Sequence, residues 1–358
     1  MLATLMALVL TVQEKPVPPR AEVVFVLDTT GSMGGLLDGA KKKIWSIANE
    51  LLKGSPKPDL RVGLVAYRDK GDAYVTQVTD LTADLDKIYE TLLGFQAQGG
   101  GDGPENVRQA LHDAVTKISW SPDRKAFKVM FLVGDAPPHL DYTDVPKIEE
   151  LCLAAVKADI TINAVRCGGD PDTGRIWQDI ASRSEGTFAS IDQGGGVVAI
   201  ATPYDKEIGE LSDKVGRTVV AFGDPSKRRE LERKEGLAAS APAAEKADRA
   251  SAKSAGGALH EEDLVDAVRD GRKKLEDLKP EEMPAELKGK TPEERKAWLD
   301  AKTKERAELQ KQVVDLSKKR EQYIADELAK RGEKDGFDSV VKDALRKQAE
   351  KKGIQFSK

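Results

Sequence analysis

Oxygen-bearing side chains follow two of the strands that the sequence predicts. Asp28, Thr30 and Ser32 stand at alternating positions directly after one apolar run, and Asp135 follows another. Side chains at i and i+2 of an extended segment share a side, so the first three can converge on one point. A hard divalent cation such as Mg²⁺ prefers an octahedron of oxygen ligands, some of them water. These four residues therefore form a candidate metal site, at which Mn²⁺ or Ca²⁺ could replace Mg²⁺.

Glycines accompany these candidate ligands in the sequence. Gly31, Gly34 and Gly35 allow the backbone to wrap closely around the first segment before a helix begins. A second Gly-rich segment, residues 99–105, precedes another predicted helix in the same half of the domain. Asp102 is its side chain expected nearest the ion, and it joins the candidate ligand set.

The elements that must position these residues alternate between strand and helix. Buried strands are predicted at 22–27, 61–67, 127–133 and 160–165, an edge strand at 74–78 and a short strand at 187–191. Helices are predicted at 36–52, 84–95, 104–118, 145–158, 173–184 and 197–215. This alternation indicates an α/β fold with a mostly parallel sheet and helices on both faces. Such sheets bind ligands at the carboxyl ends of their strands, which is where Asp28 and Asp135 stand.

The segment Asp28-Thr29-Thr30-Gly31-Ser32 matches the metal-ion-dependent adhesion site motif Asp-x-Ser/Thr-x-Ser. On this motif, and on Gly134-Asp135 as its last element, residues 21 to about 222 resemble a von Willebrand factor A (vWA) domain of bacterial-like type. That family usually offers a Thr where this chain has Gly99 to Asp102. An additional carboxylate at that place could bind the metal more tightly and reduce its pull on a partner's acidic group.

The resemblance implies a Rossmann-like three-layer fold and a non-enzymatic protein-binding module. Neutral Ser and Thr ligands would leave the ion with uncompensated positive charge and one open coordination position. An Asp or Glu side chain of a partner protein can fill that position. Arg68, Asp69, Asp72 and His139 are expected on the same rim as partner contacts, although a simple turn explains the first three about as well. His139 is expected beside the ligands because hard ions prefer oxygen.

Two other functions remain open. A phosphoesterase could use the same ion, but no general base is visible beside the metal set. Some domains of this type are cytoplasmic adaptors for an ATPase or a chaperone, and N-terminal sequencing of the mature protein separates this alternative from an exported module. A nucleotide site is not indicated, because residues 31–35 do not fit G-x-G-x-x-G and no P-loop Gly-Lys-Ser/Thr occurs.

The composition excludes further classes. The 358 residues include 57 Lys and Arg and 61 Asp and Glu, a net charge of −4 that gives no reason to expect nucleic acid as a partner. No apolar run reaches the roughly 20 residues of a membrane-spanning helix. Two cysteines cannot form a disulfide scaffold or a four-thiolate zinc site. Cys152 and Cys167 are expected to be buried thiols, although export would make a bridge chemically possible.

The two ends of the chain differ from its middle. Residues 2–10 are almost wholly apolar and suit the centre of a secretory signal, so we expect export to the periplasm or the extracellular space; an extra strand or helix is the alternative. Residues 226–358 hold 33 basic and 29 acidic side chains. We therefore divide the chain into a leader with a Pro-rich spacer (1–20), the vWA-like domain (21–222), a solvated linker (223–258) and a charged helical region (259–358).

Helices are also predicted within the charged part, at 261–278, from Thr291 to about Arg331, and at 338–351. Leu309, Leu316 and Tyr323 fit a seven-residue repeat. This stripe indicates either a helical hairpin docked on itself or a weak coiled coil. Charge at this density is typical of a solvated face, and self-association through these helices is the alternative.

Overall fold

The computed structural model describes residues 17–193, 200–256, 259–331 and 336–356. The expected apolar leader lies outside these residues. At the centre of the described chain is a six-stranded sheet with the order β3-β2-β1-β4-β5-β6. The strands are β1 (Arg20–Asp28), β2 (Asp59–Tyr67), β3 (Thr76–Thr82), β4 (Phe127–Gly134), β5 (Thr161–Cys167) and β6 (Phe188–Ile191). All pairs are parallel except β2 with β3, which confirms the predicted mostly parallel α/β sheet.

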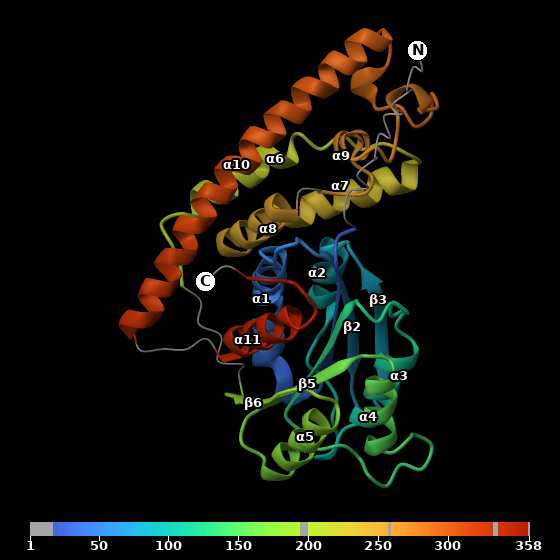
Figure 1. The fold of residues 1–358 in the computed structure, drawn as a ribbon, viewed down its shortest axis with the longest axis vertical. Helices are drawn as coiled ribbons and strands as arrows, with labels where there is room; N and C mark the ends of the chain where they lie inside the picture. The colour runs from blue at the N-terminus through green and yellow to red at the C-terminus, as the bar shows by residue number, and fades with distance from the viewer. Residues whose placement is uncertain (1–16, 194–199, 257–258, 332–335, 357–358) are drawn as a thin grey trace, which may run out of the picture.

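Helices cover both faces of this sheet, and the resulting three layers are visible in Figure 1. One face packs against α1 (Gly34–Leu52), α2 (Leu85–Gly94) and α11 (Gly336–Glu350), and the other against α3 (Val107–Thr116), α4 (Ile148–Lys157) and α5 (Pro171–Arg183). Side chains alternate between the faces of a strand. Phe25 of β1 therefore lies in the first apolar cluster, while its neighbours Val24 and Val26 lie in the second. Because both faces of the sheet are buried, the sequences of these strands are continuous apolar runs.

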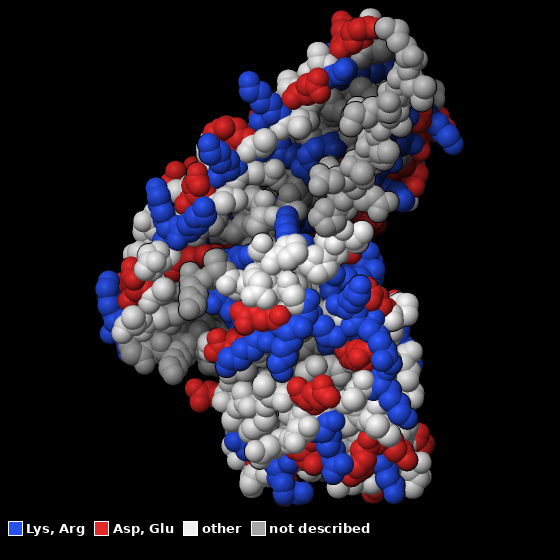
Figure 2. All heavy atoms as spheres, viewed as in Figure 1, with Lys and Arg blue, Asp and Glu red and all other residues white. Residues whose placement is uncertain are grey.

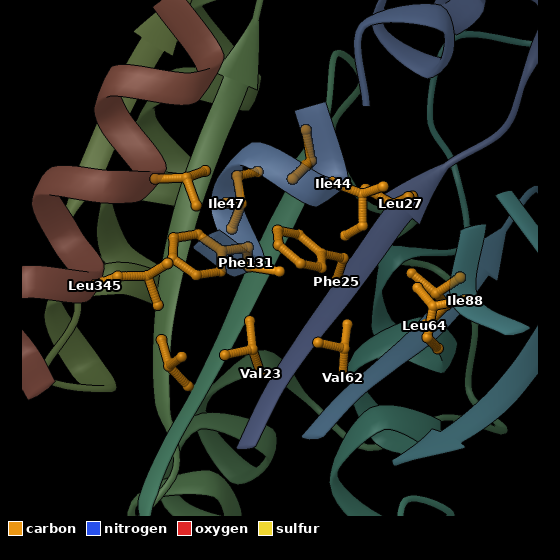
Figure 3. Close-up of a cluster of buried hydrophobic side chains, with 14 of the residues drawn as sticks. Val23, Phe25, Leu27, Ile44, Ile47, Val62, Leu64, Ile88, Phe131 and Leu345 are labelled. Carbon is orange, nitrogen blue, oxygen red and sulfur yellow. The ribbon is translucent and has the colours of Figure 1, made fainter. Parts of the chain in front are cut away.

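The last helix of the chain belongs to the sheet layers. Leu345 of α11 is fully buried in the same cluster as Phe25 and Phe131, whose ring centroids lie 5.4 Å apart (Figure 3). Ser55 and Gln355 exchange two backbone hydrogen bonds of 2.8 and 2.9 Å, which tie the end of the chain to the segment after α1. Residues 336–356 thus complete one face of the sheet, although the sequence placed them with the charged helices.

Leu345→Ala is expected to lower the free energy of unfolding by about 2–5 kcal/mol, because it removes buried methyl groups and leaves a cavity. Urea denaturation followed by circular dichroism measures the change. Leu153 on α4 is 54 % exposed and provides the matched control, with an expected effect within about 0.5 kcal/mol for Leu153→Ala. Equal effects of the two substitutions would contradict a core position for α11.

Between β6 and α11 the chain forms a further group of helices. They are α6 (Asp205–Gly216), α7 (Pro225–Ser240), α8 (Ala243–Gly256), α9 (Leu264–Arg269) and α10 (Pro292–Arg331). Ala247 and Ala250 of α8 are buried together with Ile208 of α6 and Val313 of α10. This packing differs from the solvated linker expected over 223–258. Small alanine side chains let helices approach closely, so a segment of low hydropathy still buries one face.

The long helix α10 has the bounds that the sequence predicted. Leu309 and Leu316 of its apolar stripe pack against the cluster between α6 and α8, and the Tyr323 ring meets Tyr204 edge-on with 6.4 Å between centroids. The stripe is therefore covered by helices of the same chain. The helix expected over 261–278 is only α9, because Gly271 adopts a φ of +73° that ends it.

These helices pack at the amino ends of the parallel strands. Asn49 in the last turn of α1 donates a hydrogen bond of 3.1 Å to the carbonyl of Asp248 in α8. Asp86 in the first turn of α2 pairs with Arg249 at 2.6 Å and with Lys253 at 2.9 Å. Helix α1 follows β1 and runs back along the sheet, so its last turn lies far from the carboxyl ends of the strands. Within the described chain, the helical group thus leaves the rim that carries Asp28 uncovered.

The mixed surface charge and the state of the two cysteines agree with what the composition predicted. On the face shown in Figure 2, Lys and Arg lie interspersed with Asp and Glu over the helical group and the sheet layers alike. Of the helices in the described ranges, none is long and apolar enough to span a bilayer. Cys152 and Cys167 are both free and buried, as expected.

Candidate metal centre at the sheet rim

Asp28 ends β1, and Asp135 directly follows the neighbouring strand β4. The register pairs Leu27 with Val133, so Asp28 lies level with Gly134. A side chain at Gly134 would not fit, since an added Cβ would come within 3.0 Å of Asp28 Oδ2 and closer still to the Tyr67 hydroxyl. The parallel sheet thus brings the two carboxylates to one rim, as the sequence predicted.

The hydroxyl residues of the motif lie beside Asp28. Asp28 Oδ1 accepts hydrogen bonds from the Thr30 backbone N–H at 2.9 Å and from the Thr30 hydroxyl at 2.6 Å. The Thr30 and Ser32 hydroxyl oxygens are 3.4 Å apart. Asp28, Thr30 and Ser32 therefore converge, as the alternating spacing predicted.

Two carboxylate oxygens at this rim are orphaned. Asp28 Oδ2 and Asp135 Oδ1 are buried and find no hydrogen-bond partner among the described residues, while the other Asp135 oxygen accepts a hydrogen bond from Gln193. A buried polar atom without a partner costs about 1–3 kcal/mol, and more when it is charged. A cation held between the two strands would satisfy both atoms.

The electrostatics of the rim are those of crowded, desolvated acids. Burial raises the pKa of Asp28 to about 7 against the hydrogen bonds from Thr30, and the charge of Asp135 contributes to the rise. Burial, together with the carboxylates of Asp28, Asp69, Asp72 and Asp135, raises the pKa of Glu105 to about 9. A divalent cation would reverse this balance and favour the ionised carboxylates.

Glu105 is a member of this rim that the sequence analysis missed. Glu105 is 3 % exposed, and its Oε2 is buried without a hydrogen-bond partner in the described chain. Glu105 and Thr30 both border Gly100: a Cβ added there would come within 2.8 Å of Glu105 Oε1 and 3.1 Å of Thr30 Cβ. Gly100 also has a φ of +78°, which favours glycine. The Gly-rich segment predicted a carboxylate at this place, but the residue there is Glu105 and not Asp102.

Asp102 lies in a different group from Asp28 and Asp135. Its side chain is 63 % exposed, and its Oδ2 is 3.5 Å from His139 Nε2. In the described ranges, the only set of three His, Cys, Asp or Glu residues whose ligand atoms all lie within 4.8 Å of one another is Asp69, Asp102 and His139. Against the effect of burial, Asp141, Asp69 and Asp102 raise the pKa of His139.

Arg68, Asp69 and Asp72 hold the loops of the rim together. Arg68 is 5 % exposed and donates hydrogen bonds to the carbonyls of Thr29 (3.1 Å) and Gln96 (2.6 Å). Asp72 accepts from the backbone N–H groups of Asp69 (3.2 Å) and Gly100 (3.1 Å). Arg68 and Asp69 are thus buried, where the sequence analysis had proposed partner contacts. Their position agrees with the alternative reading as parts of a turn.

Comparison with known proteins places this arrangement in a family. A family model described as von Willebrand factor A domain matches residues 22–200, half of the chain. The chain belongs to the von Willebrand factor A domain family. The vWA domain is generally a protein-interaction module.

Three relatives each match about a third of this chain. Von Willebrand factor A domain-containing protein 7 from Rattus norvegicus is 37 % identical over 122 residues, and the Homo sapiens protein is 36 % identical over the same length. The match covers 34 % of this chain and 12 % of each relative. Alpha-protein kinase vwkA from Dictyostelium discoideum is 25 % identical over 122 residues, or 19 % of its length. This chain therefore matches only a small part of these relatives.

Two solved structures each align with about half of this chain. The SpRpn10 VWA domain aligns with 49 % of this chain and 89 % of its own, at 16 % identity and a TM-score of 0.38. Proximal thread matrix protein 1 from the mussel byssus aligns with 49 % of this chain and 42 % of its own, at 17 % identity and a TM-score of 0.37.

Proposed function

We propose that this vWA domain is a non-enzymatic protein-binding module whose binding depends on a divalent cation. Asp28, Thr30, Ser32 and Asp135 would hold Mg²⁺ at the rim, and an Asp or Glu side chain of a partner protein would complete its coordination. The observation that carries this proposal is the pair of buried, orphaned carboxylate oxygens on Asp28 and Asp135.

The donor set supports a hard cation. Carboxylates and hydroxyls are the ligands that Mg²⁺, Mn²⁺ and Ca²⁺ prefer, and the four proposed ligands are two carboxylates and two hydroxyls. Thr30 and Ser32 are neutral, so the ion would keep enough positive charge to attract an acidic partner. Thr30 also holds Asp28 Oδ1 with two hydrogen bonds, which directs the orphaned Oδ2 to the remaining side.

Helix α1 and the Gly-rich segment 99–105 frame the proposed partner site. The Gly31 backbone N–H donates a hydrogen bond of 3.2 Å to the carbonyl of Gly99, and Gln98 N–H donates one of 3.1 Å to the carbonyl of Thr29. These bonds fix the motif loop against the second loop. The ligands would thus be pre-organised, so that binding costs little ordering of the protein.

Asp28→Ala is expected to abolish Mg²⁺ binding, measured by isothermal titration calorimetry as an affinity at least about 100-fold weaker. Capture of partner proteins on immobilised domain should fail equally for Asp28→Ala and for the wild type in EDTA, while circular dichroism shows an intact fold. Asp315→Ala, at an exposed position on α10, is the matched control and should behave as the wild type. Capture that survives both Asp28→Ala and EDTA would defeat the proposal.

A further inference from the structure

Three rim loops bring a histidine and two carboxylates together at a place that the first metal set does not use. Asp69 follows β2, Asp102 precedes α3 and His139 follows β4. His139 Nε2 lies 3.5 Å from Asp69 Oδ2 and 3.5 Å from Asp102 Oδ2. These separations exceed the usual 2.7–3.2 Å of a hydrogen bond that involves nitrogen. They are close to the roughly 3.4 Å between two ligand atoms of a tetrahedral Zn²⁺.

The imidazole is oriented for this role. His139 Nδ1 is 2.9 Å from Asp141 Oδ1, a contact in which Nδ1–H donates to the carboxylate; in the neutral ring, Nε2 then carries the lone pair that a cation needs. The ring stacks on Tyr142 with 4.3 Å between centroids and an 11° angle between planes. The side chain is only 11 % exposed, and Nε2 itself is buried with no hydrogen-bond partner in the described chain.

The Asp69 carboxylate and the loops that carry Asp102 and His139 are held in place as well. The Tyr142 hydroxyl donates to Asp69 at 2.8 Å, so the same tyrosine supports two members of the group. The Asp69 side chain is 9 % exposed. His139 N–H donates to the carbonyl of Glu105 at 3.0 Å, and Glu105 N–H donates to Pro137 at 2.9 Å, which joins the Asp102 loop to the His139 loop.

We propose that Asp69, Asp102 and His139 form a second cation site, selective for a divalent transition metal of the zinc class. One imidazole nitrogen and two carboxylates suit Zn²⁺ better than Mg²⁺, which prefers oxygen alone. Three protein ligands leave a fourth position for water or another group. The site shares no ligand with the set of Asp28, Thr30, Ser32 and Asp135, and it does not depend on the function proposed for that set.

The test is a Zn²⁺ titration of the full chain, followed by calorimetry and by ¹⁵N NMR of the imidazoles. The chain has three histidines, so the signals can be assigned by single substitutions. Zn²⁺ should shift Nε2 of His139, and His139→Ala should weaken this binding at least about 100-fold. Asp141→Ala should weaken it about 10–100-fold, because it removes the oxygen that accepts from Nδ1–H and orients the ring. His112→Ala removes another histidine beside a carboxylate and should change nothing.

Two further variants test the proposed Zn²⁺ site independently of His139→Ala. Asp102→Asn alters an exposed side chain and should weaken Zn²⁺ binding even if His139→Ala does not fold. Asp28→Ala should leave the Zn²⁺-dependent shift of His139 unchanged, whatever it does to Mg²⁺. Zn²⁺ affinity that is equal in the wild type, His139→Ala and Asp102→Asn would overturn the proposal. Loss of the shift in Asp28→Ala would overturn it too, because one shared ion would then explain both groups.

Discussion

In EDTA above pH 7, Asp28→Asn is expected to be more stable than the wild type, and Mg²⁺ is expected to remove most of that difference. Burial raises the pKa of Asp28 from 3.8 to about 7, with a further contribution from Asp135. The unfolded chain therefore ionises Asp28 above about pH 4, whereas the metal-free fold keeps it protonated until about pH 7. Ionised Asp28 thus destabilises the metal-free fold.

The sign and the window of this effect follow from proton linkage. A folded-state pKa above the unfolded value means that the contribution of Asp28 to stability is fully present below pH 4, declines as the pH rises, and is lost at about pH 7. The difference between the two pKa values corresponds to roughly 4 kcal/mol as an upper limit. Asparagine keeps the shape and an oxygen for the two Thr30 hydrogen bonds, but carries no charge.

Urea denaturation of both proteins at several pH values, in EDTA and in Mg²⁺, measures the effect. Mg²⁺ at 100 times its Kd should stabilise the wild type by about 2.7 kcal/mol and leave Asp28→Asn unchanged. Near pH 4 without metal the two proteins should unfold alike. A less stable Asp28→Asn at pH 8 in EDTA would show that some other group already compensates the charge of Asp28.

Arg306→Ala is expected to cost about 3–5 kcal/mol of stability, because it leaves the buried Asp263 carboxylate without its cation and the buried Asp266 carboxylate with Arg269 alone. Arg306 is 1 % exposed and reaches from α10 to Asp263 and Asp266, both fully buried. It also donates hydrogen bonds to the Thr218 hydroxyl (2.8 Å) and to the Thr218 carbonyl (2.6 Å). One side chain thus joins α10, α9 and the segment after α6.

Hydrogen exchange followed by mass spectrometry shows which elements lose stability in Arg306→Ala. Protection should fall in α9 and α10 and stay high in the sheet strands, since these helices bury a separate apolar cluster around Leu264 and Leu299. Arg183→Ala is the control: its pair with Asp179 on α5 is about half exposed, and its removal should cost less than about 1 kcal/mol. Uniform loss of protection across the sheet would contradict an independent role for Arg306.

Part of the rim could be predicted because strand ends carry local signals. A continuous apolar run indicates a parallel strand buried on both faces, and the residue after the run must lie at the carboxyl edge of the sheet. Asp28 and Asp135 were found in this way, and the i, i+2 spacing added Thr30 and Ser32. These inferences need only backbone geometry over a few residues, so they did not depend on the rest of the fold.

The Gly-rich loop shows where this reasoning stops. Both Asp102 and Glu105 are acidic residues of the segment 99–105, and nothing local separates them. The choice is made by contacts with distant loops: Asp72 accepts from Gly100 N–H, and Glu105 pairs through its backbone with residues 137–139. Those contacts turn Glu105 inward beside Thr30 and leave Asp102 exposed beside His139.

By itself, the amino-acid sequence determined the alternation of strands and helices, the mostly parallel sheet, the motif at its rim and the long helix 292–331. Each depends on a periodicity or a cap that acts between near neighbours. Only the tertiary structure decided that α11 completes the sheet layers, that the alanine-rich α8 is buried, and that the rim acids separate into two groups. These arrangements depend on packing between segments far apart in the sequence, such as Phe25 and Leu345, and such contacts leave no local pattern in the chain.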